Sequence, residues 1–194
     1  MLIATRNAHK AHEIREILGA DFKVGDLSTH PEIPETIESG KTFEENAVIK
    51  GLAVSERYDG LVVADDSGLE VDALGGAPGV TSARYAGENT TDEQNIEKLL
   101  HALARAGDAR RSARFRCVIA LARGNKILET FAGAVEGKII ERPRGSGGFG
   151  YDPIFLPNGF DETFGELAAQ TKNEISHRAK ALAELRGGLS RYVQ

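Results

Sequence analysis

Apolar and polar residues repeat along this chain with two different periods, which predict both strands and helices. The short apolar runs Met1–Thr5, Phe22–Leu27 and Leu61–Ala64 have the length and the turn-residue boundaries of buried strands. Ala113–Ala122 alternates strictly, a turn follows, and Ile127–Val135 returns, which predicts an antiparallel hairpin. The run Phe22–Leu27 should pair with Met1–Thr5, either as a hairpin or across the intervening helix. The hairpin together with strand–helix units should make the sheet mixed.

Apolar residues spaced three and four positions apart predict the helices. Capping boxes at Thr42 and Thr91 mark where two of them begin. The predicted helical segments are Ala11–Leu18, Thr42–Tyr58, Thr91–Ala106, a short piece over Glu166–Thr171, and a last helix that begins at Lys172 and ends at Gly187-Gly188.

Composition narrows the class of protein. A length of 194 residues suits one compact domain or two closely packed lobes, and 41% hydrophobic residues are enough for a core. A formal net charge of −5 argues against a protein that coats nucleic acid. No stretch approaches the roughly 18 apolar residues that span a membrane, and no signal peptide is visible. The single cysteine, Cys117, excludes an internal disulfide, so we expect a soluble cytoplasmic protein.

Two adjacent carboxylates, Asp65 and Asp66, follow the predicted strand Leu61–Ala64, and Ser67-Gly68 should turn the chain there. Acids at the end of a strand lie where α/β folds place their ligands. Burying two carboxylates needs a positive partner, and a divalent metal, with Mg²⁺ favoured, is the simplest one. An ordinary Asp-Ser-Gly turn explains the same residues. Two short strands, at Leu69–Val71 and Thr81–Tyr85, should follow.

The N-terminal strand-to-helix turn contains Thr5, Asn7 and Lys10. Backbone N–H groups and the helix dipole make such a turn an anion site, and a lysine in the first helical turn suggests that a phosphate offsets its charge. A solvated lysine beside an Asn cap is the alternative interpretation.

The run from Gly145 to Gly150 matches G-x-G-x-x-G, but Pro153 follows soon after and resists a helix, so the run is not a dinucleotide fingerprint. We expect a mobile glycine loop that brings backbone close to a ligand. Phe149 lies between glycines and is a candidate for stacking on a base. His177 and Arg178 should lie near the start of the last helix, where they suit an anionic or carbonyl-bearing ligand.

Four ordered blocks span nearly the whole chain. They are Thr5-Arg6-Asn7-Ala8-His9-Lys10, Thr42-Phe43-Glu44-Glu45-Asn46-Ala47, Ala64-Asp65-Asp66-Ser67-Gly68-Leu69 continuing to Tyr85, and Gly147-Gly148-Phe149-Gly150-Tyr151-Asp152-Pro153 with Ile175-Ser176-His177-Arg178. In this order the blocks resemble the inosine triphosphate pyrophosphatase family. The resemblance implies an α/β fold with a long mixed β-sheet flanked by helices, two lobes and a central substrate cleft, so residues 1–194 would form a single pyrophosphatase domain of two lobes. It implies hydrolysis of ITP, dITP and XTP to the monophosphate and pyrophosphate with Mg²⁺, in a homodimer.

The resemblance also implies roles for individual residues. Asp66 would be the general base and a metal ligand, and Glu38 the second metal ligand, with Glu35 as the alternative acid. Arg6 and His9 stand where glycines are common in the family, which affects the detail of the phosphate loop. The substrate-binding residues would be Thr5, Arg6, Asn7, Ala8, His9, Lys10, Lys50, Ser67, Phe149, Gly150, Tyr151, Asp152, Lys172, His177 and Arg178.

Donors from His177 or Arg178 would pair with the position-6 carbonyl of inosine or xanthine and be mispaired with adenine. Guanine has the same carbonyl, so its exclusion depends on position 2. Two rival functions fit the same residues. A Maf-type nucleotide pyrophosphatase would favour other bases, and a nucleotide sensor would bind ITP without hydrolysing it. Adjacent acids at the phosphates disfavour the sensor.

Overall fold

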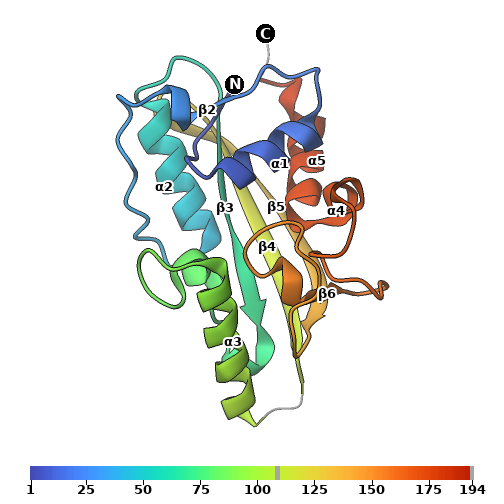
Figure 1. The fold of residues 1–194 in the computed structure, drawn as a ribbon. Helices are drawn as coiled ribbons and strands as arrows, with labels where there is room; N and C mark the ends of the chain where they lie inside the picture. The colour runs from blue at the N-terminus through green and yellow to red at the C-terminus, as the bar shows by residue number, and fades with distance from the viewer. Residues whose placement is uncertain (108–109, 193–194) are drawn as a thin grey trace. The chain divides into compact units, whose positions relative to one another are not determined.

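The computed structural model describes residues 1–107 and 110–192 and has one six-stranded mixed sheet with helices packed against it, which confirms the predicted α/β fold (Figure 1). The strand order is β2-β1-β3-β4-β5-β6. Strand β1 pairs in parallel with both β2 and β3, whereas β5 and β6 are antiparallel. The strands are β1 Leu2–Ile3, β2 Gly25–Asp26, β3 Val62–Val71, β4 Ser112–Arg123, β5 Lys126–Ile139 and β6 Phe155–Pro157.

Five α-helices lie within the described residues, and none of the described helices is long and apolar enough to cross a membrane. The capping residues predicted for α2 and α3 are present, because the Thr42 and Thr91 side chains accept the backbone N–H of Glu45 and Gln94. The helices are α1 Ala8–Leu18, α2 Phe43–Ser55, α3 Asp92–Ala106, α4 Ala169–Ile175 and α5 His177–Leu189, with 3-10 turns at Leu27–Thr29, Asp72–Leu74, Gly79–Arg84 and Asp152–Ile154.

The chain divides into two compact units that share the long strands. Unit 1 comprises Met1–Asp66, Cys117–Gly133 and His177–Gln194, and unit 2 comprises Ser67–Arg116 and Ala134–Ser176. The last two residues of unit 1 lie outside the described part of the chain, as do residues 108 and 109 of unit 2. Each unit has its own hydrophobic core. The predicted substrate cleft stays a prediction.

In unit 1, α1 and α5 pack on one face of the sheet. Ile14, Leu182 and Leu185 from these helices join Val63 and Ile119 from the strands in one buried cluster. Helix α2 covers the other face, where a Cβ on Gly51 would lie 3.5 Å from the Cβ atoms of Ala120 and Ala122. Successive strand residues point to opposite faces, so a side chain's neighbours depend on whether its position in the strand is odd or even.

In unit 2, α3 packs against the far ends of the long strands. Its Leu99 is buried with Leu69 and Val71 of β3. An aromatic group completes this core, with ring centroids of Phe115 and Phe155 4.8 Å apart in an edge-to-face arrangement. Unit 2 is therefore held together by an apolar core of its own.

The turn predicted at Ser67-Gly68 is wrong, because β3 continues without a break to Val71. Lysine side chains of the protein neutralise Asp65 and Asp66, so the chain can stay in the sheet at and after these acids. The strand predicted at Thr81–Tyr85 is also wrong. Residues 81–84 belong to a 3-10 helix that ends at Arg84. In it the Thr81 and Ser82 hydroxyls donate to the carbonyls of Pro78 and Gly79, a pattern that favours turns.

The last two predicted helices have wrong boundaries. Helix α4 begins at Ala169, not at Glu166, and runs through Lys172 to Ile175, and α5 follows after Ser176, which is extended with ψ of 162°. Gly187 and Gly188 lie inside α5 and do not end it; Gly188 allows close packing, since a Cβ there would lie 3.3 Å from Phe131. Strand β2 pairs with β1 in parallel, so the connection across α1 is the correct one of the two predicted alternatives.

Candidate active site

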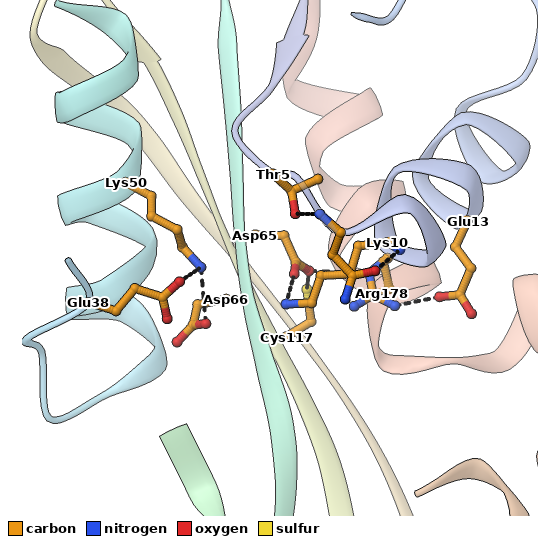
Figure 2. A network of polar contacts seen from close by, with 10 residues as sticks. Thr5, Lys10, Glu13, Glu38, Lys50, Asp65, Asp66, Cys117 and Arg178 are labelled. Carbon is orange, nitrogen blue, oxygen red and sulfur yellow. Dashed lines mark hydrogen bonds and ion pairs between the residues drawn. The ribbon is translucent and has the colours of Figure 1, made fainter. Parts of the chain in front are cut away.

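Strand β3 sends its two adjacent carboxylates to opposite faces of the sheet, as the alternation of a strand requires. Asp65 faces α1 and α5, and Asp66 faces α2 (Figure 2). Both carboxylates are buried, with 1% and 5% of their residue surface exposed. Each carboxylate is paired with a different cationic side chain of the protein, so no single ion has to neutralise both.

The Asp65 carboxylate is bound on both of its oxygens (Figure 2). Oδ1 lies 2.7 Å from the Lys10 ammonium, and Oδ2 accepts from the Cys117 thiol at 3.0 Å and from Arg178 Nε at 3.2 Å. Arg178 is 1% exposed and also donates from Nη1 to Glu13 Oε2. Two cations and two carboxylates therefore form a balanced, buried cluster.

The Asp66 carboxylate has a different environment. Its Oδ1 lies 3.1 Å from the Lys50 ammonium, which also lies 3.1 Å from Glu38 Oε1 (Figure 2). Its other oxygen, Oδ2, is buried and has no hydrogen-bond partner within the described part of the chain. A buried carboxylate oxygen without a donor is costly unless a ligand completes it.

These environments push the pKa values of the two carboxylates in opposite directions. Burial alone would raise the pKa of Asp65, but Arg178, Lys10 and the Cys117 thiol together hold it well below the usual value. Burial raises the pKa of Asp66 above the usual value, and the opposing effect of Lys50 is too small to reverse it. Paired groups with separated pKa values mark distinct acid and base roles. Asp65 stays ionised, and Asp66 is the candidate proton acceptor.

The Asp66 side of β3 fits a magnesium ion. Described residues include no group of three or more His, Cys, Asp or Glu side chains arranged to hold a metal. Magnesium is often held by only one or two carboxylates, with water and substrate phosphates as its other ligands. Glu38 and the unpartnered oxygen of Asp66 supply the oxygens that this ion prefers. Asp65 fits less well, since both of its oxygens are bound by protein groups.

The predicted phosphate turn has the expected local structure. Asn7 caps α1 by accepting the backbone N–H of Lys10 at 3.0 Å, and its own N–H donates to Thr5 Oγ1 at 3.1 Å. Helix α1 has no acidic residue in its first turn, so the positive end of its dipole is not offset there. Ala8 and His9 begin the helix and are exposed. The turn can therefore bind an anion through backbone N–H groups and a lysine side chain.

Arg6 contacts the backbone of a neighbouring segment, and its predicted role in substrate binding stays a prediction. Its guanidinium donates to the backbone carbonyls of Leu27 and Ile33 at 2.9 and 2.6 Å. It thereby ties the segment after β2 to the phosphate turn. The arginine at this departure from the family pattern supports the loop through its side chain.

Unit 2 contains Phe149, the predicted base-stacking residue, together with the predicted substrate-binding residues Asp152 and Lys172. Phe149 is half-buried, and the Lys172 ammonium lies 4.9 Å from its ring centroid. The carboxylate of Asp152 accepts from Lys172 and from the backbone N–H of Phe149, the latter at 2.9 Å. A Cβ on Gly148 would collide with the same carboxylate, so glycine is required there. The glycine loop thus places one aromatic ring beside a buried ion pair.

The other predicted residues lie around these groups. Tyr151 is buried, and its hydroxyl donates to the Ser82 carbonyl at 2.8 Å, so it supports the loop. Gly150 N–H donates to Asp92 at 2.6 Å. Ser67 lies in β3 directly after Asp66. His177 is buried at the first position of α5. Lys172 belongs to α4 in unit 2, while His177 and Arg178 belong to unit 1.

Sequence reasoning missed three residues of the site. Cys117 and Glu13 complete the cluster around Asp65, and nothing local in the sequence signals their contacts. Asn46 is fully buried, and its Oδ1 accepts the Gly40 N–H at 2.8 Å, which fixes the loop that carries Glu38. A polar residue on the buried face of α2 was the available signal for Asn46. Lys50, which the resemblance implied as a substrate-binding residue, is buried.

Comparison with known proteins places this geometry in a family. The model of the Ham1 family matches residues 1–187. The dITP/XTP pyrophosphatase of Bacillus licheniformis is 50% identical over 189 residues, which cover 95% of this chain and 95% of that protein. The dITP/XTP pyrophosphatase of Bacillus subtilis is 50% identical over 188 residues, covering 95% and 93%. A solved structure of a HAM1 protein from Coxiella burnetii is 44% identical, with a TM-score of 0.89 and coverage of 98% of both chains.

Proposed function

Because this chain belongs to the Ham1 family, we propose that it hydrolyses nonstandard purine nucleoside triphosphates, namely ITP, dITP and XTP, to the nucleoside monophosphate and pyrophosphate. The similarity to dITP/XTP pyrophosphatases extends over nearly the whole length of both chains, which supports a shared activity. The activity would remove damaged or deaminated nucleotides from the nucleotide pool.

The observation that supports this function best is the unpartnered, buried oxygen of Asp66 beside Lys50 and Glu38. A protein that only bound a polyanion would gain nothing from two acids at this position, since they repel phosphate. A hydrolase needs a carboxylate there to hold a cation and to accept a proton from water. The geometry favours Glu38 over Glu35 as the second acid, because Glu38 shares Lys50 with Asp66.

Each reacting group in the proposed mechanism has a candidate. Asp66 accepts a proton as the oxygen of a water molecule attacks the α-phosphorus. The bond between the α-phosphorus and the bridging oxygen breaks, and pyrophosphate leaves with the electron pair. Magnesium, held by Asp66 and Glu38, would neutralise polyphosphate charge and lower the pKa of water. Lys50 and Lys10 place positive charge beside the leaving pyrophosphate. Thr5, Asn7 and the first N–H groups of α1 bind its oxygens.

The base would be recognised by residues of unit 2. Phe149 offers an aromatic face for stacking. Lys172, fixed by Asp152, supplies a charged donor that can pair with a base carbonyl but is mispaired with the amino group of adenine. Discrimination of this kind reaches on the order of 10⁴-fold where the mispaired groups are buried.

Replacing Phe149 by alanine tests the stacking. The variant should raise KM for dITP by about tenfold, because stacking on one aromatic ring contributes roughly 1–3 kcal/mol. The kcat value should change by less than about threefold, since the ring is remote in role from the phosphates. Steady-state kinetics measure both values. Phe160→Ala, which removes an aromatic ring outside the glycine loop, is the matched control, and an unchanged KM in Phe149→Ala would contradict stacking.

The proposal includes two further features taken from the resemblance. The active form would be a homodimer, and the enzyme would work in the cytoplasm. A single free cysteine, buried on Asp65, suits a reducing compartment.

Pyrophosphate release tests the function and its metal requirement in one experiment. The purified protein is given dITP, XTP, GTP, ATP and a pyrimidine triphosphate, each with Mg²⁺ and again with excess EDTA. We expect rapid release from dITP and XTP, at least about 100-fold slower release from ATP, and loss of activity with EDTA.

The rival functions predict different patterns in the same assay. Preference for pyrimidine or methylated nucleotides would identify a Maf-type enzyme. Tight binding of ITP without release of pyrophosphate would identify a sensor. Full activity in EDTA would overturn the metal assignment and leave the substrate assignment intact.

A further inference from the structure

Asp65 is anchored more firmly than a substrate-binding or metal-binding acid needs to be. Its side chain has no exposed surface, and three different groups bind it: the Lys10 ammonium, the Cys117 thiol and the Arg178 guanidinium. These groups come from α1, β4 and α5, so the position of the carboxylate is determined from three elements of one unit. A carboxylate bound in this way is a rigid reference point for whatever it holds.

Of the three groups that bind Asp65, Lys10 is the most exposed, with 17% of its side-chain surface accessible. Its backbone is fixed by the Asn7 cap, but a lysine side chain is long and flexible and loses rotamer entropy when it is ordered. The contact of 2.7 Å with Asp65 orders it before any ligand arrives. An ammonium group has three donors, so Lys10 can hold Asp65 and still donate to two phosphate oxygens.

We propose that Asp65 is a positioning residue that holds the Lys10 ammonium in place for the pyrophosphate part of the substrate, with Cys117 and Arg178 fixing Asp65 in turn. This inference deepens the proposed function and rests on it. It gives the two adjacent acids of β3 separate tasks. Asp66 works on the face where an oxygen is available for metal and water, and Asp65 works through a lysine on the opposite face.

A positioning role and a purely electrostatic role for Asp65 predict opposite changes in anion affinity when Asp65 is replaced by asparagine. If Asp65 acted only through its charge, replacing it with neutral asparagine would strengthen the binding of an anion, because a nearby negative charge would be lost. If Asp65 positions Lys10, the same change should weaken the binding. Asparagine also leaves the ammonium with no charged acceptor and lets the side chain move.

A double-mutant cycle separates these cases. Binding of inorganic pyrophosphate is measured by calorimetry at saturating Mg²⁺ in the unaltered protein, Asp65→Asn, Lys10→Met and the double variant. We expect Asp65→Asn to weaken binding about tenfold when Lys10 is present and by less than about twofold when it is methionine. Equal weakening in both backgrounds, or tighter binding in Asp65→Asn, would overturn the proposal.

A second variant keeps the test valid if Asp65→Asn does not fold. Asp65→Glu retains the charge that Arg178 needs, but its extra methylene displaces the carboxylate and with it Lys10. A positioning role predicts weaker pyrophosphate binding here too, again only when Lys10 is present, whereas a role of charge alone predicts no change. Circular dichroism shows that each variant is folded.

The result can be distinguished from a failure of the proposed function. If the function is wrong, the unaltered protein releases no pyrophosphate from dITP. If only the positioning role is wrong, the unaltered protein is active and the cycle is additive. If Asp65 is instead a metal ligand, Asp65→Asn lowers the affinity for Mg²⁺ in both Lys10 backgrounds, which would also overturn the proposal.

Discussion

Asp66→Asn is expected to lower kcat for dITP by at least about 10³-fold while the protein stays folded. The change removes the proton acceptor, and loss of general-base catalysis alone amounts to about 10² to 10⁴-fold. It also removes a charge that would bind the metal. Asparagine has nearly the same shape and its oxygen can still accept from Lys50, so packing on β3 should be preserved. Pyrophosphate release under saturating dITP and Mg²⁺ measures the effect.

Asp59→Asn is the matched control for this prediction. Asp59 is an exposed acid shortly before β3, so the same chemical change there should leave kcat within about twofold. The thermal unfolding temperatures of both variants should be close to that of the unaltered protein. A kcat for Asp66→Asn within about tenfold of the unaltered protein would contradict the assignment of Asp66 as the general base, because loss of that carboxylate should lower kcat much further.

Local patterns in the sequence predicted much of the fold. The capping box at Thr91 and the apolar spacing behind it located α3, since both depend on neighbouring residues. The hairpin of β4 and β5 was predicted from alternation and is closed by Gly124 and Asn125, both at positive φ. The two acids of β3 were identified as the centre of the site because a buried strand ending in carboxylates is chemically unusual.

The failures have a common physical cause, which is dependence on distant partners. Ser67-Gly68 suggested a turn, but β3 continues through it between neighbouring strands of the sheet. The break at Ser176 and the helical Gly187-Gly188 likewise follow from packing and not from propensity. The pairing of Asp65 with Arg178 spans 113 positions, and no periodicity within either segment encodes it.

The division of labour between the two faces of β3 follows from this arrangement. One alternation of a strand separates adjacent carboxylates, so that each is neutralised by a different lysine. Asp65, with strong partners, has a lowered pKa and behaves as a fixed charge. Asp66, with a weaker balance of partners, has a raised pKa and can exchange a proton. The same residue type therefore supplies both a support and a reactive group.

The second large effect is expected from Arg178→Met, which should lower the free energy of unfolding by about 3–5 kcal/mol. The substitution keeps much of the side-chain volume but leaves Asp65 and Glu13 without the cation they share, and breaking a buried ion pair on one side has this cost. Urea unfolding followed by circular dichroism measures the loss. Arg186→Met, at an exposed position of the same helix, should change stability by less than about 1 kcal/mol.

Arg178→Met also separates two roles for this arginine. The family resemblance gives Arg178 to the base pocket, and a residue with only that role would change the preference between dITP and ATP without lowering stability. The cluster around Asp65 instead predicts a large loss of stability together with weaker pyrophosphate binding, because Asp65 would lose the guanidinium that fixes it. An unfolding free energy equal to that of Arg186→Met would show that the buried cluster does not depend on Arg178, and a support of Asp65 through this arginine would then be untenable.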